Sequence, residues 1–220
     1  MNPSLSRLGG GALVVGAAAG IVVQLVLAVN PSDRPTLNPT VIVMGWSDMV
    51  VGLLLILSLP ALLSRVAQGS RALSVIGFAC LAIAFVAYSE ILGFERAVDS
   101  PYLVAHHVDL TQGPPLGMLV ILLVGGFAKI IGGVVFGIAA WRSRAVSRVA
   151  AGLIIASSII FASGLIPFLG EVVDLIGGVM LLVGLGVCGL QLVGLWGPVS
   201  TSEPHTETRL GAAGNLTAAP

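Results

Sequence analysis

The sequence predicts an all-α integral membrane protein, a bundle of six transmembrane helices. Apolar residues make up 56% of the 220-residue chain and charged residues 9%, well below the share of about 25% that soluble domains carry. The apolar residues gather in runs of about 20, the length at which a helix crosses the hydrocarbon core of a bilayer. Basic residues stand mainly in the connections between alternate runs. Together these observations exclude a soluble protein.

Breaks rich in Pro, Gly and charged residues divide the chain into its predicted spans. No segment outside the spans is long enough for a second folded domain, so residues 1–197 are expected to form one transmembrane unit. Residues 198–220 are rich in Pro, Thr, Ser, Ala and Gly without periodicity, which is typical of a disordered tail. The spans are predicted at residues 9–29, 41–63, 72–93, 116–141, 149–169 and 172–196.

The first span is longer than the core of a signal peptide, and no small-x-small cleavage site follows it, so it is interpreted as an uncleaved helix. Its Ala12, Gly16 and Gly20 stand four residues apart. Small residues at this spacing form a face that suits close helix packing. Such a face predicts contact with another helix of the chain, with a second copy of it, or with a different membrane partner.

The second span carries Asp48 in its first half and follows a proline-rich loop. A basic turn with Arg65 and Arg71 leads into the third span, which has Glu90 close to its end. Residues 94–114 are predicted to be the longest loop, because they hold several charged residues and end in a Gly-Pro-Pro breaker.

The fourth span has the chain's single lysine, Lys129, at its centre. A cation at this depth costs roughly 2.5 to 3.5 kcal/mol on insertion scales, so it needs a partner or a wet cavity. Gly125, Gly133 and Gly137 continue its four-residue spacing, which predicts that Lys129 faces protein, not lipid. A basic turn precedes the fifth span, and Asp174 lies near the start of the sixth.

Counting basic residues outside the spans predicts the orientation. Six spans place both termini on one side with seven arginines, and leave Arg34 and Arg96 on the other. The sequence thus predicts a multi-pass protein of the cell (inner) membrane with both termini cytoplasmic and the lipid bilayer as its surroundings. A net charge of zero argues against nucleic acid as a partner. The seven are Arg7, Arg65, Arg71, Arg142, Arg144, Arg148 and Arg209.

The candidate site is formed by the ionisable residues within the spans: Asp48, Glu90, Lys129 and Asp174. Lys129 lies 13 residues after Leu116 and Asp48 seven after Val41, which is about 20 Å and 10 Å from the same outer face. A lysine stem can bridge much of the remaining offset, so Asp48 is the first candidate partner of Lys129 and Asp174 the second. These residues predict either a polar cavity open to the outer side or a structural ion pair.

Two adjacent histidines and an aspartate offer a weak metal-site candidate: His106, His107 and Asp109. Neighbouring side chains diverge, so the two histidines are poorly placed to bind one ion, and solvated loop histidines are the favoured interpretation. No HExxH, paired CxxC, GxSxG or Walker-type pattern occurs in the chain. No metal or cofactor is therefore predicted.

Three functions are compatible with these features. The favoured one is a small transporter or accessory permease whose outward-facing polar cavity surrounds Asp48 and Lys129. The second is a non-catalytic scaffold or complex subunit, which predicts a dry, closed ion pair and an exposed small-residue face. The least favoured is a membrane-embedded enzyme that uses residues 94–114, which predicts that His106 or His107 folds back towards Glu90 or Asp174.

Overall fold

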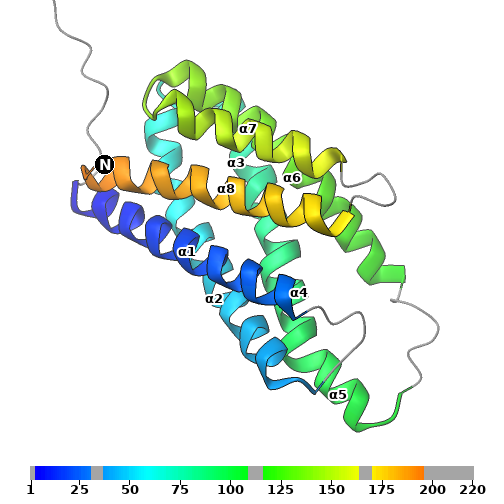
Figure 1. The fold of residues 1–220 in the computed structure, drawn as a ribbon. Helices are drawn as coiled ribbons and strands as arrows, with labels where there is room; N and C mark the ends of the chain where they lie inside the picture. The colour runs from blue at the N-terminus through cyan, green and yellow to red at the C-terminus, as the bar shows by residue number, and fades with distance from the viewer. Residues whose placement is uncertain (1–2, 31–36, 109–115, 164–169, 196–220) are drawn as a thin grey trace, which may run out of the picture.

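The computed structural model describes residues 3–30, 37–108, 116–163 and 170–195, and within them every regular element is a helix (Figure 1). Five helical stretches are long and apolar enough to cross a membrane by length and composition, and α7, with 16 residues, is shorter. The predicted helical membrane bundle is confirmed. The elements are α1 (Pro3–Val29), α2 (Pro39–Val66), α3 (Arg71–Phe85), η1 (Val86–Ile91), α4 (Leu92–Phe94), η2 (Glu95–Asp99), α5 (Ser100–Ala105), α6 (Leu116–Ser143), α7 (Arg148–Ser163) and α8 (Gly170–Val193).

The third helical rod is much longer than its predicted span. The segments from α3 to α5 follow one another without a break from Arg71 to Ala105, over 35 residues, so the rod is about 50 Å long against a hydrocarbon thickness of about 30 Å. The loop predicted from residue 94 is therefore wrong as far as Ala105. Its charged residues favour helix well enough to continue the rod beyond the apolar run.

The other helices differ from the predicted spans mainly at their ends. α1 begins six residues before the predicted start at residue 9, and α8 covers Gly170–Val193 instead of residues 172–196. α7 ends at Ser163, and the rest of the fifth predicted span, residues 164–169, lies outside the described residues. The predicted tail, residues 198–220, also lies outside them.

The helices close into a ring in chain order. α1 packs against α2 and α8, α7 packs against α6 and α8, and α3 packs against α2 and α6. The core that they enclose is apolar, and the following residues in it have no exposed surface: Leu13, Leu59, Leu62, Val66, Leu81, Phe136, Ala139, Ala140, Ala150, Ala151, Ile154, Leu185 and Cys188.

The turns that carry the basic residues meet at one end of the bundle, called the basic end below (Figure 1). Gly69 in the α2–α3 turn lies against Ser143 at the end of α6. The backbone N–H of Ser147 donates to Oε1 of Gln191 near the end of α8, at 3.0 Å. Gly10 near the start of α1 packs on the last turns of α8. The basic turns and the start of α1 thus lie at one end of the bundle, as the count of basic residues predicted. That this end faces the cytoplasm stays a prediction.

The small-residue face of α1 is used inside the chain. A Cβ atom at Gly16 would lie 3.2 Å from Leu55 of α2, and one at Gly20 would lie 3.0 Å from Leu182 of α8. Both glycines are buried. The spacing therefore predicted a close helix contact correctly, and its partners are α2 and α8 of the same chain.

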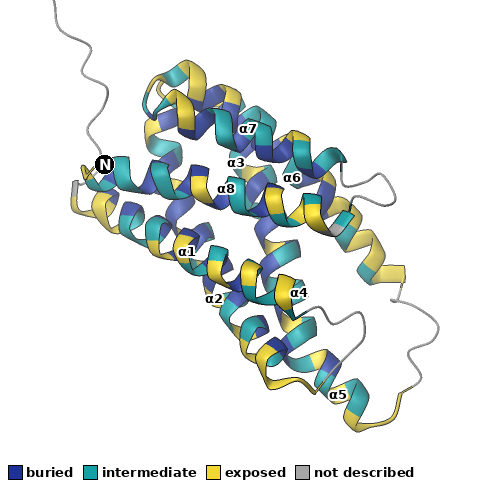
Figure 2. Cartoon of the chain, viewed as in Figure 1, coloured by how far each residue is buried: buried dark blue, intermediate teal, exposed yellow. Residues whose placement is uncertain are grey.

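Exposure is distributed unevenly between the two ends. Figure 2 shows that the helices are most buried where all of them overlap and more exposed towards α5 and the start of α6. In α6 the stretch from Leu116 to Val124 is apolar, yet seven of its nine residues are exposed. Apolar side chains exposed on a membrane bundle are expected to contact lipid tails.

Candidate functional site

Asp48 is placed on a face of α2 that lies unusually close to the third rod. Gly45 and Gly52 flank it, three residues before and four residues after. A Cβ atom at Gly45 would lie 2.8 Å from the backbone nitrogen of Ala97, and one at Gly52 would lie 2.6 Å from the Cβ atom of Ser89. The two glycines thus bring Asp48 within reach of the side chains on η1 and η2.

Asp48 pairs with Arg96, not with the lysine that the sequence suggested. Nη1 of Arg96 donates to Oδ2 of Asp48 at 3.2 Å, and their side chains are 31% and 10% exposed. The pairing was not predicted because Arg96 had been assigned to a loop outside the membrane. The continuous third rod, with its wide π-helical turns η1 and η2, directs Arg96 back to α2.

Lys129 faces protein, as the glycine spacing predicted, and aromatic rings hold it. Its Nζ atom lies 3.7 Å from the ring centroid of Phe161 on α7 and 5.2 Å from that of Tyr88 on η1. The two rings meet edge to face, with centroids 5.7 Å apart and planes at 88°. Ring faces attract an ammonium group by their quadrupole. Among the described residues, no Asp or Glu oxygen lies within 4.0 Å of Nζ.

Glycines let the neighbouring helices approach α6 on both sides of Lys129. Gly125, one turn before it, lies directly against Ala87 of η1, and Gly133, one turn after it, lies directly against Ser158 of α7. Side chains at these two positions would separate the helices. The close approach is what brings the rings of Tyr88 and Phe161 over the ammonium group.

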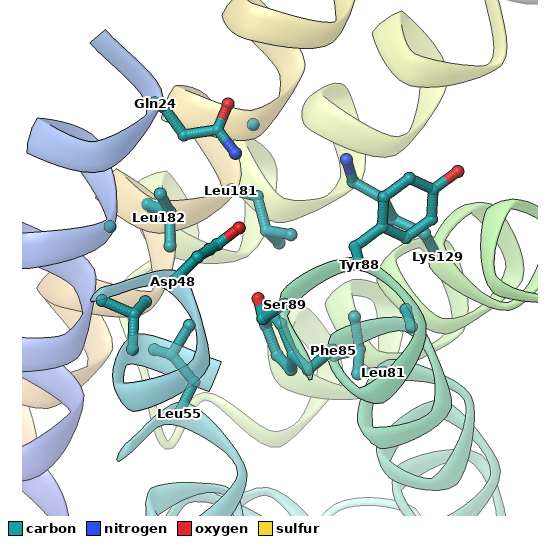
Figure 3. Close-up of a pocket in the computed structure, with 14 residues that line it drawn as sticks. Gln24, Asp48, Leu55, Leu81, Phe85, Tyr88, Ser89, Lys129, Leu181 and Leu182 are labelled. Carbon is teal, nitrogen blue, oxygen red and sulfur yellow. The ribbon is translucent and has the colours of Figure 1, made fainter. Parts of the chain in front are cut away.

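A cavity of about 50 Å³ separates Asp48 from Lys129 (Figure 3). A buried water needs roughly 10–15 Å³ by this measure, so there is room for several water molecules. Its polar lining comes from Gln24, Asp48, Ser89 and Lys129, together with Tyr88, and its remaining walls are glycine and apolar side chains of α1, α2, α3 and α8. The predicted residues Asp48 and Lys129 are therefore brought to one site without contacting each other.

The other two predicted carboxylates do not line this cavity. Glu90 points its Oε1 atom at Gly52, where that oxygen is buried and has no hydrogen-bond partner among the described residues. Asp174 lies on α8 with its side chain exposed. Glu90 is thus next to the site on η1. Asp174, on the exposed side of α8, lies near enough to interact electrostatically with Lys129 and Tyr88 without forming an ion pair within 4.0 Å.

The histidines lie far along the third rod, at its end. His106 stacks on Tyr102 with ring centroids 4.1 Å apart, and its Nδ1 atom lies 2.9 Å from the carbonyl oxygen of Tyr102. His107 has a positive φ of 53° and is exposed. Asp109 lies outside the described residues. In the described part of the chain, no three His, Cys, Asp or Glu side chains are grouped so that they could hold a metal ion.

Sequence reasoning missed Gln24, Ser89, Arg96 and the two rings around the lysine. Only ionisable residues within spans had been considered, although an amide such as Gln24 is also costly in an apolar run and needs hydrogen-bond partners. That signal was present in the sequence. The role of Phe161 had no comparable signal, because a phenylalanine in an apolar span is an ordinary packing residue.

Comparison with known proteins gives no relative: no protein-family model, no curated protein and no solved structure matches the chain. Function is therefore inferred from the residues and contacts described above. Those contacts place two opposite charges on the walls of one small cavity, each held by a different neighbour.

Proposed function

We propose that this protein is a small membrane transporter or accessory permease whose polar centre is the cavity between Asp48 and Lys129. One observation carries the proposal: the two charges face a space large enough for several water molecules and do not contact each other. Charged side chains in a membrane bundle are costly and usually mark a pathway for ions, protons or solutes. A cavity of this kind gives such a pathway a binding point near the middle of the bilayer.

The contacts give less support to a purely structural role. A structural pair would be dry and closed, whereas Asp48 is held by Arg96 and Lys129 by two rings. A scaffold was also expected to keep its small-residue face free for a partner, but Gly16 and Gly20 of that face are covered by helices of the same chain.

An enzyme built on residues 94–114 receives less support still. It requires His106 or His107 to fold back towards the carboxylates near the cavity. Instead, helix continues to Ala105 and His106 stacks on Tyr102 of its own helical turn.

The proposed opening is outward. The basic end carries the arginines that favour the cytoplasmic side, and Arg96, which pairs with Asp48, lies on the part of the third rod that extends away from that end. A solute would then enter past the Asp48–Arg96 pair and reach Lys129.

Thiol labelling tests the outward opening. Cys80 and Cys188 are first replaced by alanine, and single cysteines are introduced as Ser89→Cys in the cavity, Ser157→Cys in the dry core and Thr40→Cys at the exposed start of α2. A membrane-impermeant methanethiosulfonate reagent is added to intact cells. Labelling of Ser89→Cys and Thr40→Cys but not of Ser157→Cys is expected. If Ser89→Cys reacts only in inside-out vesicles or not at all, the outward cavity is ruled out.

Flux through reconstituted protein tests transport itself. Proteoliposomes are challenged with small ions and neutral solutes, and volume change and charge movement are recorded against empty liposomes. Lys129→Met should abolish the flux that the unmodified protein supports, while Asp99→Asn, an exposed carboxylate outside the cavity, should leave it unchanged. A flux that Lys129→Met preserves would contradict the proposal.

A further inference from the structure

The two charged groups at the cavity are of opposite kinds. Figure 3 shows Nζ of Lys129 and the side-chain amide of Gln24 approaching the cavity from α6 and α1, while a carboxylate oxygen of Asp48 and the hydroxyl of Ser89 approach it from α2 and η1. The ammonium group of Lys129 can only donate hydrogen bonds and the ionised carboxylate of Asp48 can only accept them, while the amide of Gln24 and the hydroxyl of Ser89 can do both. A ligand that satisfies both charged groups must itself carry an acceptor group and a donor group.

Each charge is held in place without help from the other. The rings of Phe161 and Tyr88 hold the ammonium group of Lys129 by its positive charge, which leaves N–H donors for an anionic oxygen. Arg96 donates a hydrogen bond to Oδ2 of Asp48. The other carboxylate oxygen of Asp48 can still accept hydrogen bonds from a ligand. The site is thus arranged before any ligand binds, which lowers the cost of binding.

The size of the cavity limits the ligand. Its volume of about 50 Å³ corresponds to roughly three to five water molecules, so a ligand of about five non-hydrogen atoms fills it. Leu181 and Leu182 of α8 and Phe85 of α3 form apolar walls of the cavity.

We infer that the cavity binds a small zwitterion, a molecule with a carboxylate and an ammonium group a few atoms apart, of the size of glycine. Its carboxylate binds Lys129 and Gln24, and its ammonium group binds Asp48 and Ser89. A simple anion would leave the second oxygen of Asp48 without a donor, and a simple cation would leave the N–H groups of Lys129 without an acceptor, whereas a zwitterion supplies both. This inference names the solute class for the transport function proposed above and rests on it.

Ligand binding to the purified full-length protein tests the inference. Thermal unfolding in detergent and titration calorimetry are carried out with glycine, sodium acetate and methylammonium chloride at equal concentration and ionic strength. Glycine is expected to raise the midpoint temperature and to give a measurable Kd, whereas acetate and methylammonium are expected to bind at least about tenfold more weakly, because each pairs with only one wall.

Single substitutions test how much Lys129 and Asp48 each contribute to glycine binding. Lys129→Met and Asp48→Asn should each weaken glycine binding by about tenfold or more, and Asp99→Asn should leave it unchanged. Alanine should bind more weakly than glycine, and Leu181→Ala, which enlarges the cavity, should remove that preference. If a charge variant does not fold, the three probes on the unmodified protein decide between the ligand classes.

Other outcomes overturn the inference in distinguishable ways. Acetate binding as tightly as glycine would make the cavity an anion site, and methylammonium binding as tightly would make it a cation site. Failure of all three probes to bind, with flux and Ser89→Cys labelling intact, removes the zwitterion and leaves transport standing. Glycine binding without flux or labelling removes transport and leaves a binding pocket.

Discussion

The half of the bundle at the basic end is packed tightly with apolar side chains, whereas the opposite half contains the Asp48–Arg96 pair and the uncovered start of α6. In the first half, Phe136, Ile154 and Leu185 have no exposed surface. In the second, the third rod contains the wide π-helical turns η1 and η2. The cavity and Lys129 lie where the two halves meet.

This difference between the halves shows that the contacts that stabilise the fold and the residues that form the site lie largely in different parts of the bundle. Small residues in the half at the basic end let helix backbones touch, and such close contacts stabilise helices in lipid, where burial of apolar surface gives little driving force. In the opposite half, Gly45 and Gly52 also bring α2 close to the third rod, but an ion pair and a small polar cavity lie among the helices there. Polar groups that cost stability are tolerated there because tight packing elsewhere holds the bundle together.

The largest loss of stability is expected when a side chain is added where two helix backbones touch in the tightly packed half. In Gly77→Ala the new Cβ atom would lie 2.5 Å from the backbone nitrogen and 2.7 Å from the Cα atom of Phe136, so α3 and α6 must separate. A loss of roughly 2–3 kcal/mol in the free energy of unfolding is expected, measured by titration with SDS from a mild detergent.

Gly11→Ala is the matched control for this change. Nothing lies within 4 Å of the Cβ atom that it adds to α1, so stability should stay the same or rise slightly through helix propensity. Equal losses for Gly77→Ala and Gly11→Ala would mean that helix contact in the half at the basic end does not dominate stability.

The next largest effect concerns the ion pair of the opposite half. Asp48→Asn and Arg96→Gln should each lower the free energy of unfolding by about 1–2 kcal/mol, less than for a fully buried pair because the Arg96 side chain is 31% exposed. The double variant should lose less than the sum of the single ones. Additive losses in this cycle would show that the pair contributes no coupling, and Asp99→Asn serves as the neutral control.

A smaller effect is expected from the rings that hold the lysine. Phe161→Leu removes the nearer ring and should cost about 1 kcal/mol of cation–π attraction, in addition to the lost packing. The same change made in a Lys129→Met background should cost less by about that amount. Tyr88→Phe keeps its ring and should leave stability nearly unchanged. If Phe161→Leu costs the same in both backgrounds, ring packing alone explains its contribution.

The sequence was sufficient for the tightly packed half of the fold. Hydropathy predicted the helices. The basic residues in the turns predicted which turns lie at the same end of the bundle: Arg65, Arg71, Arg142 and Arg148. Spacings of four among small residues also predicted close contacts, because the same periodicity places these residues on one helix face. What the periodicity cannot state is the partner, and Gly16 and Gly20 contact helices of their own chain.

The site was predicted less completely, for a physical reason. Charge within an apolar run marks Asp48 and Lys129, but depth along separate helices does not determine which side chains face each other. Ending the third span at residue 93 removed Arg96 from consideration, because a change from apolar to charged composition was taken as the end of the helix. Helix propensity does not require apolar residues, so the rod continued and placed Arg96 beside Asp48.

The smallest effect is expected at the uncovered start of α6, and it tests the comparison between the halves most directly. Leu123 is 49% exposed, and Leu185 of the tightly packed half is 0% exposed. Leu185→Ala should cost about 2 kcal/mol, because it leaves a cavity among packed neighbours. Leu123→Ala should change the free energy of unfolding by less than about 0.5 kcal/mol, because lipid or detergent fills the space of the lost side chain. A loss near that of Leu185→Ala would mean that another protein surface covers the start of α6, and a dependence of the Leu123→Ala effect on protein concentration would identify that surface as a second copy of the chain.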